Sequence, residues 1–334
     1  MRGDSAVVPA CDSDMPTETS QNSDPRRIRL AMLGMVEENG HPFSWSAIIN
    51  GRFDSAIIRA AGYGVISDYL SAQPESALGL AGAEITHIWC DRTEDAEAVA
   101  QSAGIEHCLS NPTEAIGLVD AVIIPTDKGE QHLDRARPFV EAGLPVFIDK
   151  PLTVRRDHLQ QFVAWHEAGK QIGSSSAMRY AQEFLELRQR LSEVGKLRLI
   201  VATCAKSWER YGIHALEAVY GLLPSGGWQD VCNTGSSVAN IVHVRHDLPA
   251  DIVIVVNDDM FGGFCHVTVY GTIGRLDARF RDSFAAFKAQ LQTFVDYVRG
   301  RSNSIGFNET VEQCKIIIAG IQSREDGGRR YGLE

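Results

Sequence analysis

The chain has 334 residues, of which 44% are hydrophobic, and a net charge of −11. Its length corresponds to about two domains. The negative charge argues against nucleic acids and membranes as main partners, and no apolar run approaches the roughly 18 residues of a membrane helix. The seven cysteines are scattered and form no CxxC pair, which predicts reduced thiols in the cytoplasm.

The first 26 residues are polar and rich in Ser, Asp and Pro. They contain no sustained apolar stretch of the kind found in a signal peptide. Such a composition cannot bury enough apolar surface to fold by itself. The sequence therefore predicts a disordered tail over residues 1–26.

The next part of the chain alternates short apolar runs with helical patterns. We predict strands over 28–33, 84–90, 121–125 and 144–148, and helices over 44–49, 93–103 and 131–141. This alternation predicts a doubly wound parallel sheet, that is, a dinucleotide-binding Rossmann domain over residues 27–150. Residues 51–82 delay the second strand, and we interpret them as an inserted lid or interface segment.

The fourth predicted strand ends in a charged sequence, Asp149-Lys150-Pro151. Parallel sheets bind ligands beyond the carboxyl ends of their strands, and Pro151 stops the strand because it has no N–H for the ladder. Lys150 is therefore expected where a ligand would lie. The alternative is a surface lysine before a loop.

The turn after the first strand differs from a regular GxGxxG phosphate-binding turn. It keeps the first glycine, Gly34, lacks the other two, and carries Glu37 and Glu38. A regular turn brings backbone N–H groups to a pyrophosphate at a helix start. Here we predict Ser44 as the helix N-cap, with the backbone at Ser44 and Trp45 as the remaining phosphate donors.

Asp91 follows the second predicted strand, and Arg92 follows Asp91. An acid at this place accepts hydrogen bonds from ribose hydroxyls and repels a 2′-phosphate, which favours NAD(H) over NADP(H). Arg92 is a candidate to stack on adenine or to meet a phosphate. The alternative for Asp91 is an acid that only serves the start of the next helix.

The second half, residues 151–334, predicts an α+β substrate-binding domain. Strands at 197–205, 237–247, 252–257, 264–271 and 274–280 predict a large open, mostly antiparallel sheet, flanked by helices at 155–168, 182–194, 213–223, 284–298 and 309–321. Such a sheet offers a face for a homodimer or homotetramer. His214 is predicted near the start of a helix, where a neutral imidazole can accept a proton; the alternative is a capping or core histidine.

Several of these motifs together resemble the Gfo/Idh/MocA oxidoreductases, over about residues 28–331. Asp149-Lys150-Pro151 resembles the Glu-Lys-Pro signature of that family, Pro125-Thr126 with His132 its threonine/proline turn, residues 176–180 its Asn-x-Arg-Phe strand, and residues 212–217 its Gly-x-His-x-x-Asp helix start. The resemblance implies that Lys150 and His214 are catalytic. It also implies that Pro125, Thr126, His132 and Asp149 line the cofactor, and that Arg179 and Tyr211 bind substrate.

One departure from the family pattern concerns the catalytic histidine. The family has an acid four residues before it, and here that position is Arg210. Glu217 lies one helical turn after His214 and is the acid expected to neighbour it. With Lys150 nearby, like-charge repulsion is expected to lower the pKa of His214.

The resemblance implies an NAD(P)-dependent oxidoreductase that transfers hydride between nicotinamide and a carbinol or keto carbon of a sugar, cyclitol or polyol. Three alternatives stay open. These are an NAD-retaining lyase or hydrolase on the same scaffold, a catalytically impaired binding or regulatory protein, and a metal-dependent isomerase using His214 and Glu217. No set of metal ligands stands out in the sequence, so the isomerase ranks last.

Overall fold

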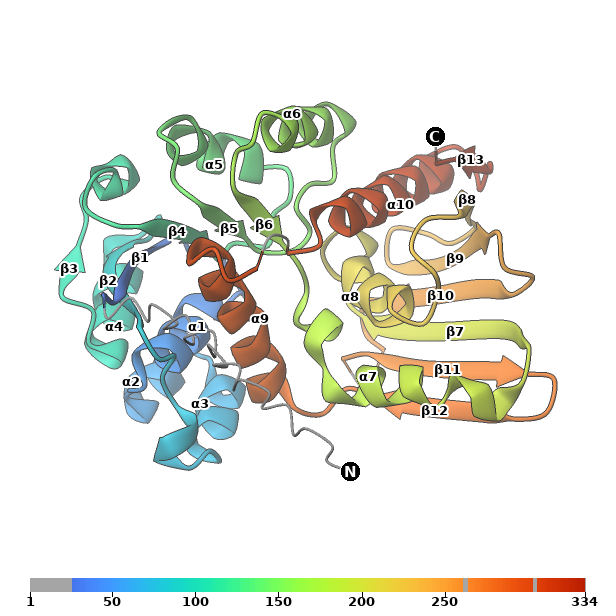
Figure 1. Cartoon of the computed structure of the whole chain (residues 1–334), viewed down its shortest axis with the longest axis horizontal. Helices are drawn as coiled ribbons and strands as arrows, with labels where there is room; N and C mark the ends of the chain where they lie inside the picture. The colour runs from blue at the N-terminus through green and yellow to red at the C-terminus, as the bar shows by residue number, and fades with distance from the viewer. Residues whose placement is uncertain (1–25, 261–263, 303–304, 334) are drawn as a thin grey trace, which may run out of the picture.

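The computed structural model describes residues 26–260, 264–302 and 305–333. The chain forms two sheet-based lobes with helix α9 (Ser283–Val298) lying between them in the view of Figure 1. The predicted disordered tail, residues 1–26, lies almost entirely outside the described residues.

The first lobe is built on a six-stranded parallel sheet in the order β3-β2-β1-β4-β5-β6. Its strands are β1 (Ile28–Leu33), β2 (Ala83–Trp89), β3 (His107–Cys108), β4 (Ala121–Ile124), β5 (Val146–Ile148) and β6 (Ile172–Ser174). The side chains of β4 and β5 are wholly buried, as expected for strands covered on both faces. The predicted Rossmann-type sheet is confirmed, and it includes one strand, β6, from the segment 151–334.

Helices cover both faces of this sheet. On one face lie α1 (His41–Asn50), α4 (Thr93–Ala103) and α9, which share one apolar core. On the other face lie α5 (His132–Glu141) and α6 (Arg156–Glu167). The segment 51–82 forms α2 (Ser55–Ala60), α3 (Gly64–Ser71) and a short 3₁₀ turn at Glu75–Ala77.

Helix α1 begins at His41, so the prediction that Ser44 is its N-cap is wrong. Gly40 is the N-cap, and the Asn39 side chain accepts a hydrogen bond from the His41 N–H at 2.9 Å. Pro42 stands in the first turn, where a missing N–H costs nothing. Ser44 is therefore one turn inside the helix and buried, and its hydroxyl accepts a hydrogen bond from Tyr69.

The second lobe is built on a seven-stranded sheet in the order β12-β11-β7-β10-β9-β8-β13. The strands are β7 (Leu197–Ala205), β8 (Trp228–Asn233), β9 (Ala239–His246), β10 (Asp251–Asn257), β11 (His266–Gly271), β12 (Arg275–Arg279) and β13 (Tyr331–Gly332). Only β7 and β10 pair in parallel, so the predicted mostly antiparallel sheet is confirmed. It packs with α7 (Gln182–Gln189), α8 (Trp208–Tyr220) and α10 (Phe307–Glu325).

Helix α8 begins at Trp208, so His214 lies in its middle and not at its start as predicted. Ser207 precedes it in an extended conformation, and Glu209 complements the positive end of the helix dipole in the first turn. Trp208 is fully buried, and its indole N–H donates to the Ile317 carbonyl at 3.0 Å. Trp208 therefore belongs to the core of the second lobe.

A buried ion pair joins three segments of the second lobe. The Arg179 guanidinium, in the 3₁₀ turn Ala177–Tyr180, donates to both Glu217 carboxylate oxygens on α8, at 2.7 and 3.0 Å. It also donates to the Ile305 carbonyl at 3.0 Å, and the Ser176 N–H donates to Glu217 at 3.0 Å. Arg179 thereby ties α8 to the segment that leads into α10.

We predict that Arg179→Ala lowers the free energy of unfolding by about 3–5 kcal/mol, because it leaves the Glu217 carboxylate buried without its partner. The measurement is urea unfolding followed by circular dichroism. Arg188→Ala, on the exposed face of α7, is the matched control and should change stability by less than about 0.5 kcal/mol. Equal small effects of both substitutions would contradict the prediction.

Candidate active site

A cavity of about 510 Å³ lies at the carboxyl edge of the parallel sheet, between the two lobes. It brings together Lys150 and His214, as predicted, and its other walls come from the turn after β1, from the segment 51–82 and from the second lobe. The lining residues are Glu38, Asn39, Gly40, His41, Gly62, Tyr63, Gly64, Val65, Ile66, Tyr69, Asp127, Lys150, Lys206, Tyr211, His214, Phe264 and Phe287. The inserted segment, in which the sequence showed no chemistry, thus forms part of the wall.

Lys150 follows β5 and is almost completely buried. Its ammonium lies 3.6 Å from the Asp127 carboxylate and 4.7 Å from the centre of the Tyr211 ring. Burial by itself would lower the pKa of Lys150, but the carboxylates of Asp149 and Asp127 outweigh it and raise the pKa above its usual value. Lys150 is therefore a charged donor, aimed into the cavity at neutral pH.

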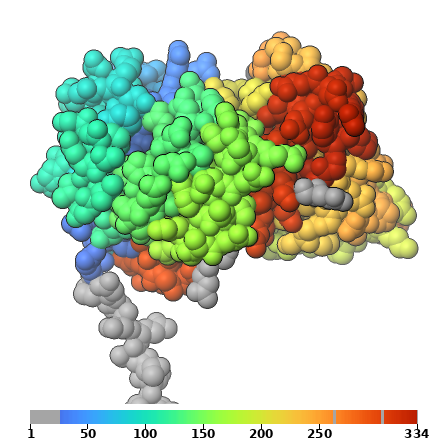
Figure 2. Space-filling model, turned by 90° about the horizontal axis from the view of Figure 1, so that it is seen from above, coloured from blue at the N-terminus to red at the C-terminus, as the bar shows by residue number. Residues whose placement is uncertain are grey.

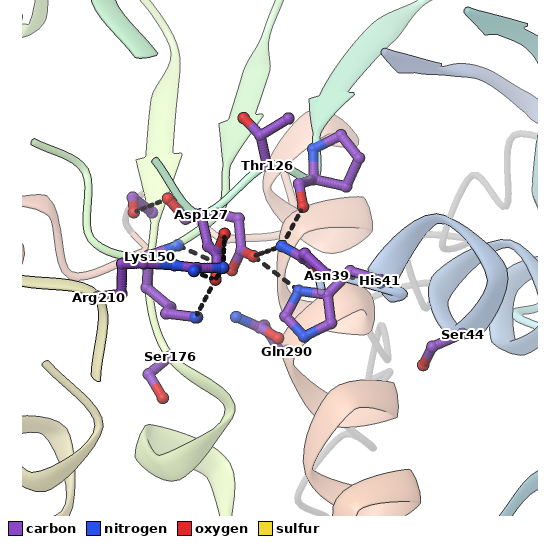
Figure 3. Close-up of polar contacts among 12 residues, drawn as sticks. Asn39, His41, Ser44, Thr126, Asp127, Lys150, Ser176, Arg210 and Gln290 are labelled. Carbon is purple, nitrogen blue, oxygen red and sulfur yellow. Dashed lines mark hydrogen bonds and ion pairs between the residues drawn. The ribbon is translucent and has the colours of Figure 1, made fainter. Parts of the chain in front are cut away.

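Arg210 stands at the position where the family pattern has an acid, and it forms an ion pair with Asp127 of the first lobe. Its guanidinium donates to Asp127 at 2.9 Å, as Figure 3 shows. Burial would raise the pKa of Asp127, but Lys150 and Arg210 together lower it. Asp127 directly follows Pro125-Thr126, and its place after a strand is the one signal that would have drawn attention to it in the sequence.

The turn after β1 reaches across to the ends of β4 and β5. The Asn39 amide donates to the Pro125 carbonyl at 2.9 Å, and His41 Nδ1 lies 2.6 Å from the Asp149 carboxylate (Figure 3). The His41 ring stacks on Trp45 and meets the edge of Phe287. The sequence marked His41 only by its position in this turn, so its approach to Asp149 was missed.

His214 is buried, and its ring hydrogen-bonds a serine hydroxyl and not the expected carboxylate of Glu217. Its Nδ1 lies 2.6 Å from the Ser176 hydroxyl, while Nε2 has no partner among the described residues. Glu217 is held by Arg179, and among the described residues no hydrogen bond joins its carboxylate to the His214 ring. Burial, followed by the charges of Lys150, His41 and Lys206, holds the pKa of His214 well below its usual value. The predicted lowering by Lys150 is confirmed.

Of the two residues predicted to bind substrate, Tyr211 and Arg179, only Tyr211 lines the cavity. Tyr211 lines the cavity, and its hydroxyl accepts a hydrogen bond from the Lys206 ammonium at 3.0 Å. Arg179 does not line it, because its guanidinium is taken up by Glu217 and by backbone carbonyls. Lys206 was not singled out in the sequence; it lies at the end of β7 with a positive φ of 71°.

The residues around Gly34 fit a dinucleotide, although the second and third glycines are missing. Gly34 has a φ of +112°, and a Cβ there would come within 3.0 Å of the side chains of Arg135 and Thr126. Asp91 accepts from the Met35 N–H at 3.2 Å and from Arg135 at 2.7 Å. The Thr126 hydroxyl is buried with no partner in the described part of the chain. Arg135, which the sequence did not reveal, offers phosphate a cation where the glycine N–H groups are absent.

The remaining cofactor candidates occupy different surroundings. His132 is completely buried and bridges two loops, with Nε2 2.8 Å from the Thr126 carbonyl and Nδ1 2.9 Å from the Pro151 carbonyl. Trp45 is buried against Phe147, and Figure 3 shows Ser44 apart from the polar cluster. Arg92 is largely exposed, near Glu94 and Asp95. Contact of these residues with a cofactor stays a prediction.

The described residues contain neither a cluster of metal ligands nor a helix that could span a membrane. Within residues 26–260, 264–302 and 305–333, no group of three or more His, Cys, Asp or Glu side chains is arranged to hold a metal ion. In the same residues, no helix is both long and apolar enough to cross a membrane.

The two buried histidines predict a loss of stability in mild acid. The pKa values of His214 and His132 are both lowered from 6.5, mainly by burial. Below about pH 6.5 the unfolded chain takes up protons that the folded protein does not, so the free energy of unfolding falls by up to ~1.4 kcal/mol per pH unit for each histidine. Urea unfolding at a series of pH values between about 7.5 and 5 measures this slope. His214→Gln should make it shallower, and an unchanged slope would contradict the assignment.

The comparisons with known proteins agree with this geometry. Residues 60–174 match the model of an oxidoreductase family with an NAD-binding Rossmann fold. No curated protein matches the chain.

Among solved structures, GenD2 from gentamicin A biosynthesis, in complex with NAD, has a TM-score of 0.72 and 16% identity over 98% of this chain and 100% of that one. Scyllo-inositol dehydrogenase from Lactobacillus casei, with bound NAD(H) and scyllo-inositol, has a TM-score of 0.69 and 13% identity, over 92% and 99% of the two chains. A myo-inositol dehydrogenase from Corynebacterium glutamicum has a TM-score of 0.68 and 18% identity, again over 92% and 99%. At these identities the likeness shows a shared fold. Together with the family match over residues 60–174, this shared fold agrees with the resemblance of the chain to the Gfo/Idh/MocA oxidoreductases.

Proposed function

We propose that the protein is a dehydrogenase or reductase that transfers hydride between a nicotinamide dinucleotide and the carbinol or keto carbon of a sugar, cyclitol or related polyol. The observation that carries the proposal is that the Lys150 ammonium and His214, whose Nε2 has no partner among the described residues, line one cavity. Gly34 and Thr126 follow strands β1 and β4 at the same carboxyl edge of the sheet. The dinucleotide, when bound, supplies the hydride acceptor or donor.

Lys150 is the group that polarises the reacting oxygen. A carbon releases hydride only as its hydroxyl loses a proton, so negative charge develops on that oxygen. A buried ammonium held by Asp127 is preorganised to stabilise this charge in surroundings that contain little water. His214 Nε2 faces the same space and is the second group proposed to contact the hydroxyl.

Gly34, Asp91, Thr126 and Arg135 are the residues proposed to hold the dinucleotide. Gly34 permits close approach of the backbone, and Arg135 meets phosphate. Asp91 accepts hydrogen bonds from the ribose, which supports the preference for NAD(H) over NADP(H). Its present partner, Arg135, is then free to turn toward the pyrophosphate.

The test of the proposed function begins with calorimetric titration of the protein with NAD, NADH, NADP and NADPH. We expect the protein to bind NAD and NADH more tightly than NADP and NADPH. Asp91→Ala should reduce this difference in affinity. Myo-inositol, scyllo-inositol and a panel of sugars then serve as substrates, with NADH absorbance as the signal. Lys150→Ala should reduce turnover by a factor of at least about 10².

The outcomes separate the alternatives. Binding of no nucleotide would remove the dehydrogenase and favour a binding or regulatory protein. Tight binding without net NADH formation, together with cleavage of a glycoside, would favour the NAD-retaining lyase or hydrolase.

We further propose that the protein forms a homodimer or homotetramer through the open face of the second sheet, in the cytoplasm. Val201, Ile241, Val253 and Val255 lie on neighbouring strands with their side chains on the face opposite the buried Ile252 and Ile254. An apolar sheet face of this kind is typical of an interface.

Ile241→Asp is expected to lower the molar mass measured by sedimentation equilibrium to that of a monomer, because it places a charge in the centre of the proposed interface. Ile273→Asp is the matched control, since Ile273 is more exposed than Ile241 (77% against 51%) and lies in the turn between β11 and β12. An unmodified protein that is already a monomer would contradict the proposal.

A further inference from the structure

The cavity contains a second histidine, His41, which has no counterpart in the family pattern. Unlike the His214 ring, the His41 ring lies against a carboxylate. His41 Nδ1 lies 2.6 Å from Asp149 Oδ2. In the part of the chain that the structure describes, His41 is the only side chain within salt-bridge distance of Asp149. Asp149 is fully buried. Its other oxygen accepts from the Lys150 N–H at 2.8 Å, which fixes the carboxylate in place.

This contact leaves the second ring nitrogen of His41 available. When Nδ1 donates to a carboxylate, neutral imidazole carries its lone pair on Nε2. No hydrogen bond joins Nε2 to any described residue, and the side chain is 18% exposed and lines the cavity of Lys150 and His214. Stacking on Trp45 and edge contact with Phe287 hold the ring plane.

The surroundings of the two histidine rings differ in charge. An imidazolium at His214 would be buried near the positive charges of Lys150, His41 and Lys206. Its one hydrogen-bond partner among the described side chains is the neutral Ser176 hydroxyl. An imidazolium at His41 would lie beside the Asp149 carboxylate, which already accepts a hydrogen bond from Nδ1–H. A buried carboxylate favours a positive charge at its side, and among the described residues the His214 ring has no carboxylate within salt-bridge distance, whereas the His41 ring has Asp149.

We propose that His41, held by Asp149, is the proton acceptor of the site, and that His214 hydrogen-bonds the substrate oxygen without taking up its proton. This inference rests on the proposed function. In the oxidation, the carbinol C–H bond breaks and its electron pair leaves as hydride to the oxidised nicotinamide dinucleotide. The O–H bond breaks at the same carbon, its proton passes to His41 Nε2, and its electrons complete the C=O bond. In the reduction, the His41 imidazolium returns the proton.

The arrangement also accounts for the altered turn after β1. Counted from Gly34, Asn39 lies where a regular GxGxxG turn has its third glycine, and His41 follows two residues later. Asn39 fastens the turn to the Pro125 carbonyl. The carboxylate–histidine pair that Arg210 makes impossible on α8 is thus formed on the first lobe instead, by two residues 108 positions apart.

The test compares His41→Gln with His107→Gln, an exposed histidine outside the cavity, using the polyol that the unmodified protein turns over best. His41→Gln should lower kcat by a factor of about 10²–10⁴ and leave the calorimetric affinity for NAD unchanged. His107→Gln should change neither. An unmodified protein with no turnover of any polyol would overturn the proposed function and this inference together. Normal kcat in His41→Gln would overturn the inference alone.

Two further measurements separate proton transfer from a structural role. Added imidazole should restore turnover to His41→Ala, and the rate with a series of substituted imidazoles should rise with the pKa of the added base. If added imidazole restored turnover to His214→Ala and not to His41→Ala, the proton acceptor would be His214 and the inference would be overturned. Nitrogen-15 NMR should show His41 with a protonated Nδ1 and a bare Nε2, a state that Asp149→Asn should disturb. A protonated Nε2 in the neutral ring of the unmodified protein would overturn the inference without reference to activity.

Discussion

The architecture depends on keeping one ammonium group charged in a place that water hardly reaches. Moving an ion into a protein interior costs several kcal/mol unless opposite charges and hydrogen bonds surround it. Lys150 meets this requirement with Asp127 and Asp149, and Asp127 is in turn held by Arg210 from the second lobe. The charge balance of one lysine therefore spans both lobes, and the site is complete only when they are packed together.

The turn after β1 shows how a phosphate-binding element can be turned to a different task. Gly34 keeps the close approach of the backbone that a dinucleotide needs. The following residues, however, point their side chains at the ends of β4 and β5, where Asn39 bonds the Pro125 carbonyl and His41 bonds Asp149. Arg135, which donates to Asp91 in the structure, is the cation proposed to meet the phosphate in place of the missing glycine N–H groups. The proposed contacts to the cofactor and part of the proposed catalytic site would thus come from one short segment.

The sequence predicted what local patterns determine, and failed where partners are far apart in the chain. Apolar runs bounded by turns indicated the strands of both sheets, and the bounds predicted for α4 and β7 match the structure. Lys150 was predicted because the end of a parallel strand has a known position. Ser176 at His214, Arg135 at Asp91 and Asp127 at Arg210 are pairs 38 to 83 residues apart. No periodicity encodes such pairs. The bounds of α1 and α8 were wrong because their first turns rest on Asn39, Pro42 and Ser207, and not on the apolar pattern.

The path of the chain has a consequence for how the protein can be divided. After completing most of the second sheet, the chain returns to the first lobe as α9, whose Phe284, Leu291 and Phe294 belong to the core beneath α1, and then crosses back as α10. Figures 1 and 2 show α10 beside α6 of the first lobe, on the other face of that lobe. A fragment cut after the parallel strands would expose the apolar surface that α9 covers. The two lobes are therefore spatial units that are interleaved along the chain, and neither can be inherited, expressed or exchanged as one continuous stretch of sequence.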